Sequence, residues 1–227
     1  MTSGSIIMIP SSVDVNSLDD LTWKRQQGSF TLKSRIQFGS REFTINGHKA
    51  SEALVIHEYI GIRDELNEIG SEEFSLEPEE AIIRKGAKIW VTPKYLVVDR
   101  QEYKPFVKQI INKGLGLAEN TVYYLLLDTQ RMGKQYPDHW ARCFSDREGR
   151  VDRGTVYGTK INKDTVFARE LNDATAKSIG VSTNYFGNPA NIRVSASGAI
   201  TIYKDVEPNI FLKFIESQVL PYQIKLD

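Results

Sequence analysis

Residues 131–169 contain the side-chain types that bind nucleic acid. The segment has nine basic residues against five acidic ones, an excess of four positive charges. Arginine and lysine neutralise phosphates, and aromatic rings stack on unpaired bases, so the two types together indicate a nucleic-acid surface on a β-hairpin. The candidate phosphate contacts are Arg142, Arg147, Arg150, Arg153 and Lys160, and the candidate stacking residues are Trp140 and Tyr157.

The same charges have two other interpretations. Acidic residues alternate with the arginines, which is also typical of an ordinary solvated turn; these are Asp146, Glu148 and Asp152. Alternatively, the basic surface pairs with the acidic stretch at residues 71–80, either within the chain or across a dimer.

Three side chains near this segment have the chemistry for proton transfer. Asp128 follows an apolar run, residues 122–127, whose strand would hold the carboxylate rigidly. Asp138 precedes His139, whose imidazole titrates near neutral pH. If the protein cuts or modifies a nucleic acid, Asp128, Asp138 and His139 are the candidates for catalysis. Their spacing defines no particular reaction, so the sequence leaves open whether the chain is an enzyme.

Motifs for metals and cofactors are missing from the sequence. One cysteine, Cys143, and three scattered histidines form no metal-binding pattern. Gly114 and Gly116 lack the following glycine and Lys-Ser/Thr of a phosphate loop. The identity of any cofactor therefore stays unknown.

The overall charge favours a local binding surface instead of a global one. Lysine plus arginine and aspartate plus glutamate each number 29, so the formal net charge is zero. The low cysteine usage fits a reducing compartment, the first residues do not resemble a signal peptide, and no apolar run reaches the ~20 residues of a membrane span. We expect a cytoplasmic protein with no membrane contact, able to form a homodimer or another homo-oligomer.

Hydrophobic periodicity predicts four β-hairpins, each followed by a helix. The first unit has strands at residues 30–38 and 43–45, a turn at Gly39 and Ser40, and a helix at residues 51–70. The acidic residues 71–80 are expected to form a solvated linker. The second unit has strands at residues 88–91 and 95–98, and a helix that has Pro105 in its first turn and ends at Gly114.

The two later units repeat this pattern. Residues 122–127 predict a central strand, followed by a hairpin at residues 140–159 and a helix from Asn162 or Asp164 to Gly180. The fourth unit turns at Ser197 and Gly198 and ends in a helix terminated by Pro221. The apolar face of that helix consists of Phe211, Phe214, Ile215 and Val219.

These elements predict an α+β fold, a largely antiparallel sheet built from about four hairpin-plus-helix units. The provisional division is an N-terminal half at residues 1–116 and a C-terminal half at residues 117–227. The alternative is one continuous, highly curved sheet with helices on one face. For function, the first hypothesis is nucleic-acid binding or processing; the alternatives are a non-catalytic interaction or self-assembly module and a small-molecule enzyme of unknown substrate.

Overall fold

The computed structural model describes residues 1–68, 74–147, 153–165 and 174–224. The strands up to the first helix are β1 (Thr2–Met8), β2 (Thr22–Gln27), β3 (Phe30–Ile45), β4 (His48–Glu68), β5 (Phe74–Val91) and β6 (Tyr95–Val98). The later strands are β7 (Tyr123–Tyr124), β8 (His139–Ser145), β9 (Gly154–Tyr157), β10 (Thr175–Thr183), β11 (Ala190–Ser195) and β12 (Ala199–Ile202). The helices are α1 (Lys104–Gly114), α2 (Thr129–Gly133) and α4 (Pro208–Phe214), the last continued by a π-helical segment (Ile215–Val219).

All twelve strands belong to one antiparallel sheet. Its order is β2-β3-β4-β5-β6-β1-β12-β11-β10-β8-β9, and β7 pairs with β1 beside this path. The prediction of an α+β fold made of about four hairpin-plus-helix units is therefore wrong, because the described strands form a single large antiparallel sheet in which β4 replaces the helix expected in the first unit and β10 replaces the end of the helix expected in the third. The division at residues 116 and 117 stays a prediction, since β1 pairs with strands on both sides of it.

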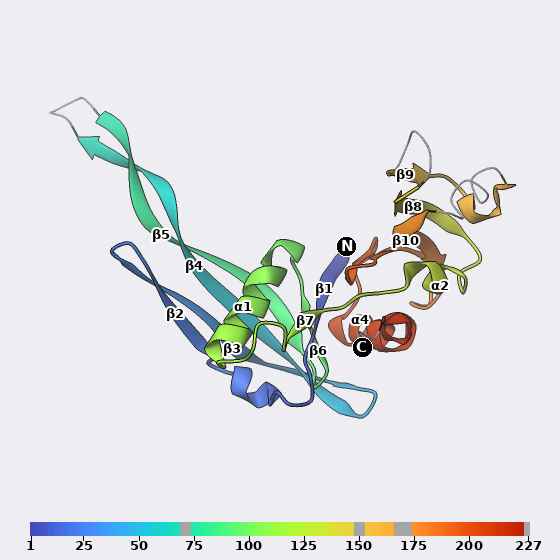
Figure 1. Ribbon diagram of the computed structural model, residues 1–227, viewed down its shortest axis with the longest axis horizontal. Helices are drawn as coiled ribbons and strands as arrows, with labels where there is room; N and C mark the ends of the chain where they lie inside the picture. Colours follow the sequence, from blue (N-terminus) through green and yellow to red (C-terminus); the bar gives the residue numbers. More distant parts are fainter. Residues whose placement is uncertain (69–73, 148–152, 166–173, 225–227) are drawn as a thin grey trace.

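Strand β1 joins two blocks of five strands. It pairs with β6, the last strand of the β2–β6 block, and with β12, the last strand of the β8–β12 block. Each block ends in a hairpin followed by a helix: β5, β6 and α1 in the first block, and β11, β12 and α4 in the second. Figure 1 shows the two blocks extending in opposite directions from this junction.

Helices α1 and α4 pack on opposite faces of the sheet, which we call the α1 face and the α4 face. In β1, Ile7 packs with Val107 of α1, whereas Ile6 packs with Phe211 of α4, as the alternation of side chains along a strand requires. Both faces of β1 are therefore buried. The α-helices that pack on the β8–β12 block, α2 and α4, share the α4 face with Val194 of β11. Among the residues that the structure describes, no α-helix packs on the α1 face of that block.

The segment predicted as a helix at residues 51–70 is instead part of β4. Apolar and small residues occur at both alternating positions of β4, so the sequence lacks the period of two that indicates a half-buried strand. Ala53 and Val55 are buried on the α1 face, while Leu54 and Ile56 lie on the α4 face. The β4–β5 pairing continues to Glu68 and Phe74, so the expected linker contains the start of β5; residues 71–73 of it lie outside the described residues.

Three other predicted elements also need correction. The turn at Gly39 and Ser40 is an irregularity within β3, where the register shifts between Phe38 and Glu42. Of the central strand predicted at residues 122–127, only the two residues of β7 form a strand. The helix ending at Gly180 is wrong over its last part, which is β10; residues 166–173 lie outside the described residues.

The second and fourth hairpins, by contrast, are confirmed. The turn between β5 and β6 closes on Thr92, whose hydroxyl accepts from the backbone N–H of Tyr95 at 3.0 Å. Helix α1 begins beside Pro105, and the turn before β12 has Gly198 at a φ of 78°. The predicted apolar face of the last helix is fully buried; its members are Phe211, Phe214, Ile215 and Val219.

Candidate nucleic-acid interface

Three aromatic side chains form a cluster on the α1 face of the β8–β12 block. Trp140 of β8 stacks on Tyr157 of β9, with ring centroids 6.4 Å apart and planes 21° apart. Tyr203, directly after β12, meets Trp140 edge to face at 5.4 Å. Tyr157 is 63% exposed and Tyr203 is 50% exposed, so the cluster presents ring surface to solvent. The structure thus brings the two predicted stacking residues together and adds a third.

Gly180 of β10 makes room for this cluster. A Cβ atom at this position would lie 2.7 Å from the Trp140 ring and 2.8 Å from the Cβ of Ala141. The indole therefore lies over the glycine, and its Nε1 donates to the carbonyl of Val181 at 3.2 Å. Because β11 and β12 follow β10 in the sheet, this position lets Trp140 reach Tyr203.

Arg193 lies beside the aromatic cluster on the same face. It is opposite Gly180 in β10 and opposite Thr201 in β12. Its Nε donates to the hydroxyl of Ser178 at 3.2 Å, which uses one of the five N–H donors of the guanidinium. Arg193 therefore supplies a positioned, half-buried positive charge next to the exposed rings.

The predicted arginines do not all join this surface. Arg142 is opposite Ile179, whose side chain lies in the core on the α4 face, so Arg142 lies on the face away from Trp140. Burial lowers the pKa of Arg142. Arg153 and Lys160 are exposed, at the start and beyond the end of β9, and Arg147 is half-buried after β8. Arg150 lies outside the described residues.

The three candidates for catalysis each have a partner that stabilises local structure. Asp128 caps α2 by accepting from the backbone N–H of Arg131 at 2.8 Å. Asp138 forms an ion pair with Lys163 at 2.7 Å, and this hydrogen bond lowers the pKa of Asp138. His139 Nε2 lies 2.8 Å from the carbonyl of Gly133, which requires the proton on Nε2, and burial lowers the pKa of its imidazole. Their catalytic role stays a prediction.

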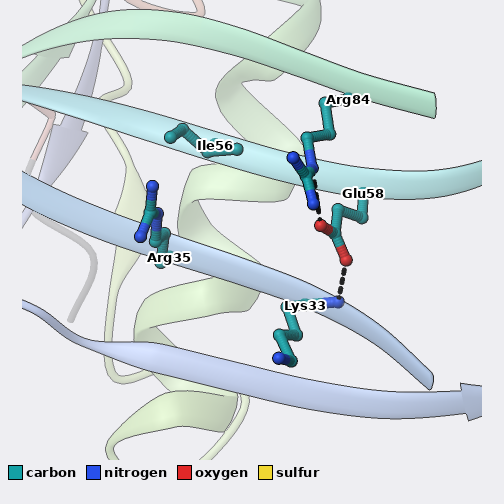
Figure 2. A pocket seen from close by; sticks show the side chains of 5 residues that line it. All are labelled: Lys33, Arg35, Ile56, Glu58 and Arg84. Carbon is teal, nitrogen blue, oxygen red and sulfur yellow. Dashed lines mark hydrogen bonds and ion pairs between the residues drawn. The ribbon is translucent and has the colours of Figure 1, made fainter. Parts of the chain in front are cut away.

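A second polar site, which the sequence did not reveal, lies on the α4 face of the β2–β6 block. Figure 2 shows its lining side chains, which come from β3, β4 and β5. The cavity has a volume of about 420 Å³ and is lined by Lys33, Arg35, Ile56, Glu58 and Arg84. We call it the basic pocket.

The alternation in β3 is the signal that could have revealed this pocket. Lys33 and Arg35 alternate with the buried Leu32 and Ser34, which places both cations on one face of a strand. The helix predicted at residues 51–70 hid the opposite wall, because Glu58 aligns with Lys33 only when β4 pairs with β3.

The part of the chain that the structure describes contains neither a candidate metal site nor a candidate membrane-spanning helix. Within it, no group of three or more His, Cys, Asp or Glu side chains is placed to hold a metal ion. No helix in the same residues is both long and apolar enough to cross a membrane.

Comparisons with known proteins identify no relative. No protein-family model, no characterised protein and no solved structure matches this chain.

Proposed function

We propose that the α1 face of the β8–β12 block binds single-stranded nucleic acid. The observation that carries the proposal is the exposed cluster of Trp140, Tyr157 and Tyr203 beside Arg193 on one face of the sheet. Aromatic rings stack on unpaired bases irrespective of their sequence, and a neighbouring arginine contacts the phosphates. Paired bases are hidden inside a duplex, so this surface favours single strands.

The distribution of charge along the chain supports this proposal. Residues 61–82, which include the paired ends of β4 and β5, contain eight acidic residues and one basic residue. The rest of the chain therefore has 28 basic and 21 acidic residues; of this excess of seven positive charges, six belong to residues 83–116 and one to residues 117–227. Figure 1 shows the β8–β9 hairpin at the opposite end of the molecule from the ends of β4 and β5. The acidic segment is thus remote from the aromatic cluster.

Fluorescence anisotropy with labelled oligonucleotides of about 20 residues tests the proposal. The affinity is measured at about 50 mM and at about 200 mM salt, because phosphate contacts weaken as the salt concentration rises. We expect single-stranded DNA or RNA to bind more tightly than duplex. Trp140→Ala should weaken binding about 5- to 100-fold, which corresponds to one stacked base. Arg193→Gln should reduce the slope of log affinity against log salt by about one.

Trp23→Ala is the matched control, because Trp23 is a half-buried tryptophan on β2, in the other block. It should leave the affinity unchanged. Absence of binding to every polymer at the lower salt concentration, or equal losses in Trp140→Ala and Trp23→Ala, would refute the proposal.

A further inference from the structure

The basic pocket owes its charge to the register of four strands. Lys24 of β2 is directly opposite Lys33 of β3, and Arg84 of β5 is directly opposite Glu58 of β4. Arg35 is opposite Ile56 in the adjoining row. Like charges placed opposite each other in a sheet are unfavourable, so the pairing of Lys24 with Lys33 costs stability that a bound anion would recover.

Glu58 balances only part of this charge. Its side chain accepts from Nε of Arg84 at 2.9 Å and from the backbone N–H of Lys33 at 2.8 Å. Burial raises the pKa of Glu58, but these two hydrogen bonds and the nearby cations outweigh it and lower the pKa overall, so the carboxylate is charged at neutral pH. With Glu58 and Arg84 paired, Lys33 and Arg35 leave two positive charges around the cavity.

The shape of the pocket suits a compact anion that carries an organic group. Figure 2 shows Arg35 and Arg84 on either side of Ile56. The two guanidinium groups supply forked donors that match phosphate oxygens, and Lys33 adds an ammonium group. Ile56 supplies an apolar wall between them, and a cavity of about 420 Å³ is within the range of small-molecule sites.

We propose that the basic pocket binds a phosphate monoester, held by Arg35, Lys33 and Arg84. A monoester is close to a dianion at neutral pH and neutralises both unbalanced charges, whereas a carboxylate would neutralise one. The phosphate can belong to a free nucleotide or to the end of a nucleic-acid strand, which present the same chemistry. The pocket lies in the other block from the aromatic cluster, so this inference does not depend on the proposed function.

Isothermal titration calorimetry on the full chain tests the pocket with pyrophosphate, a nucleoside 5′-monophosphate and the nucleoside without phosphate. We expect the first two to bind and the nucleoside not to bind. Arg35→Gln should weaken the binding of the monophosphate about tenfold or more, since it removes charged hydrogen bonds. Glu58→Gln should strengthen the binding of the monophosphate, because the substitution removes a negative charge from the pocket. Circular dichroism establishes that each variant is folded.

Arg41→Gln is the matched control, because Arg41 is an exposed arginine of the same strand whose ion pair with Glu207 lies outside the pocket. It should leave monophosphate binding unchanged. Lack of binding by both phosphate ligands, or equal affinities in Arg35→Gln and Arg41→Gln, would overturn the inference.

Two single-stranded oligonucleotides of the same sequence, one with and one without a 5′-phosphate, distinguish the two possible sources of the phosphate. If the phosphorylated oligonucleotide binds more tightly and Arg35→Gln abolishes this difference in affinity, the pocket binds the ends of strands. If the free monophosphate binds but the two oligonucleotides have equal affinities, the pocket binds a free nucleotide.

Discussion

Lys104 is a buried lysine whose protonation should control the stability of the protein. It lies at the start of α1 and is 7% exposed. Its Nζ donates to the carbonyl of Ser197, in the turn between β11 and β12, at 2.6 Å and lies 4.7 Å from the ring centre of Tyr124. Burial nevertheless lowers its pKa from 10.5 to about 8. The charged form is therefore less favourable in the folded protein than in the unfolded chain.

The sign and size of the effect follow from this difference. Between pH 8 and 10.5 the unfolded chain binds a proton at Lys104 that the folded protein has lost, so stability rises with pH in this window. Between pH 7 and 9.5 the free energy of unfolding should rise by about 2 kcal/mol. Lys104→Met should remove this rise.

Urea unfolding followed by circular dichroism at pH 7 and pH 9.5 measures the effect for the wild type and for Lys104→Met. The difference between the two proteins isolates the lysine, because all other titrating groups are common to both. Lys108→Met is a useful control, since Lys108 lies one turn further along α1 and also contacts Tyr124. If the wild type and Lys104→Met show the same change with pH, the pKa argument is wrong.

Two further substitutions test the core and the aromatic cluster. His57 lies 2.8 Å from the hydroxyl of Ser34, and burial, with a smaller contribution from Arg25, lowers its pKa from 6.5 to about 4. Stability should therefore fall by up to about 3 kcal/mol as the pH drops from 6.5 to 4, and His57→Gln should reduce this loss in urea titrations; an unchanged loss would contradict the assignment. Gly180→Ala should cost about 1–3 kcal/mol and change the near-ultraviolet circular dichroism of Trp140, because the new methyl group would overlap the indole. An unchanged spectrum and stability would show that the indole does not lie over Gly180.

Local signals predicted the parts of the fold that depend on neighbours in sequence. The β11–β12 hairpin has alternating buried residues and a glycine at positive φ, and the apolar face of α4 repeats with helical spacing. Strand β4 was not predicted because both of its alternating sets of side chains contain apolar residues. Its Ala53, Ile56 and Ile60 consequently fall at helical spacing as well. Only the long-range pairing of β4 with β5 distinguishes the two interpretations.

The candidate interface was predicted in part for a related reason. Trp140 and Tyr157 lie together as expected, but Arg142 is on the other face of the sheet. In a regular strand, residues two apart share a face. In β8, Ala141 pairs with Gly180 and His139 pairs with Val181, so Trp140 is an extra residue at a shift in register. This extra residue places Trp140 and Arg142 on opposite faces of the sheet. Whether Arg193 and Tyr203 lie near Trp140 depends on the order of strands in the sheet, which the sequence leaves open.

The central position of β1 also determines the order in which the protein can assemble during synthesis. Residues 2–8 are made before all of the strands with which they pair, and one of their edges can pair once residues 95–98 of β6 have been made. On the other edge, residues 7 and 8 can pair with β7 once residues 123–124 have been made, but residues 2–5 have to wait for residues 199–202 of β12. From the synthesis of β6 to that of β12, about 100 residues, the growing chain therefore has a strand whose edge is unpaired along residues 2–5, and unpaired strand edges favour aggregation. Slow translation or truncation before β12 should make chaperones most important for this protein.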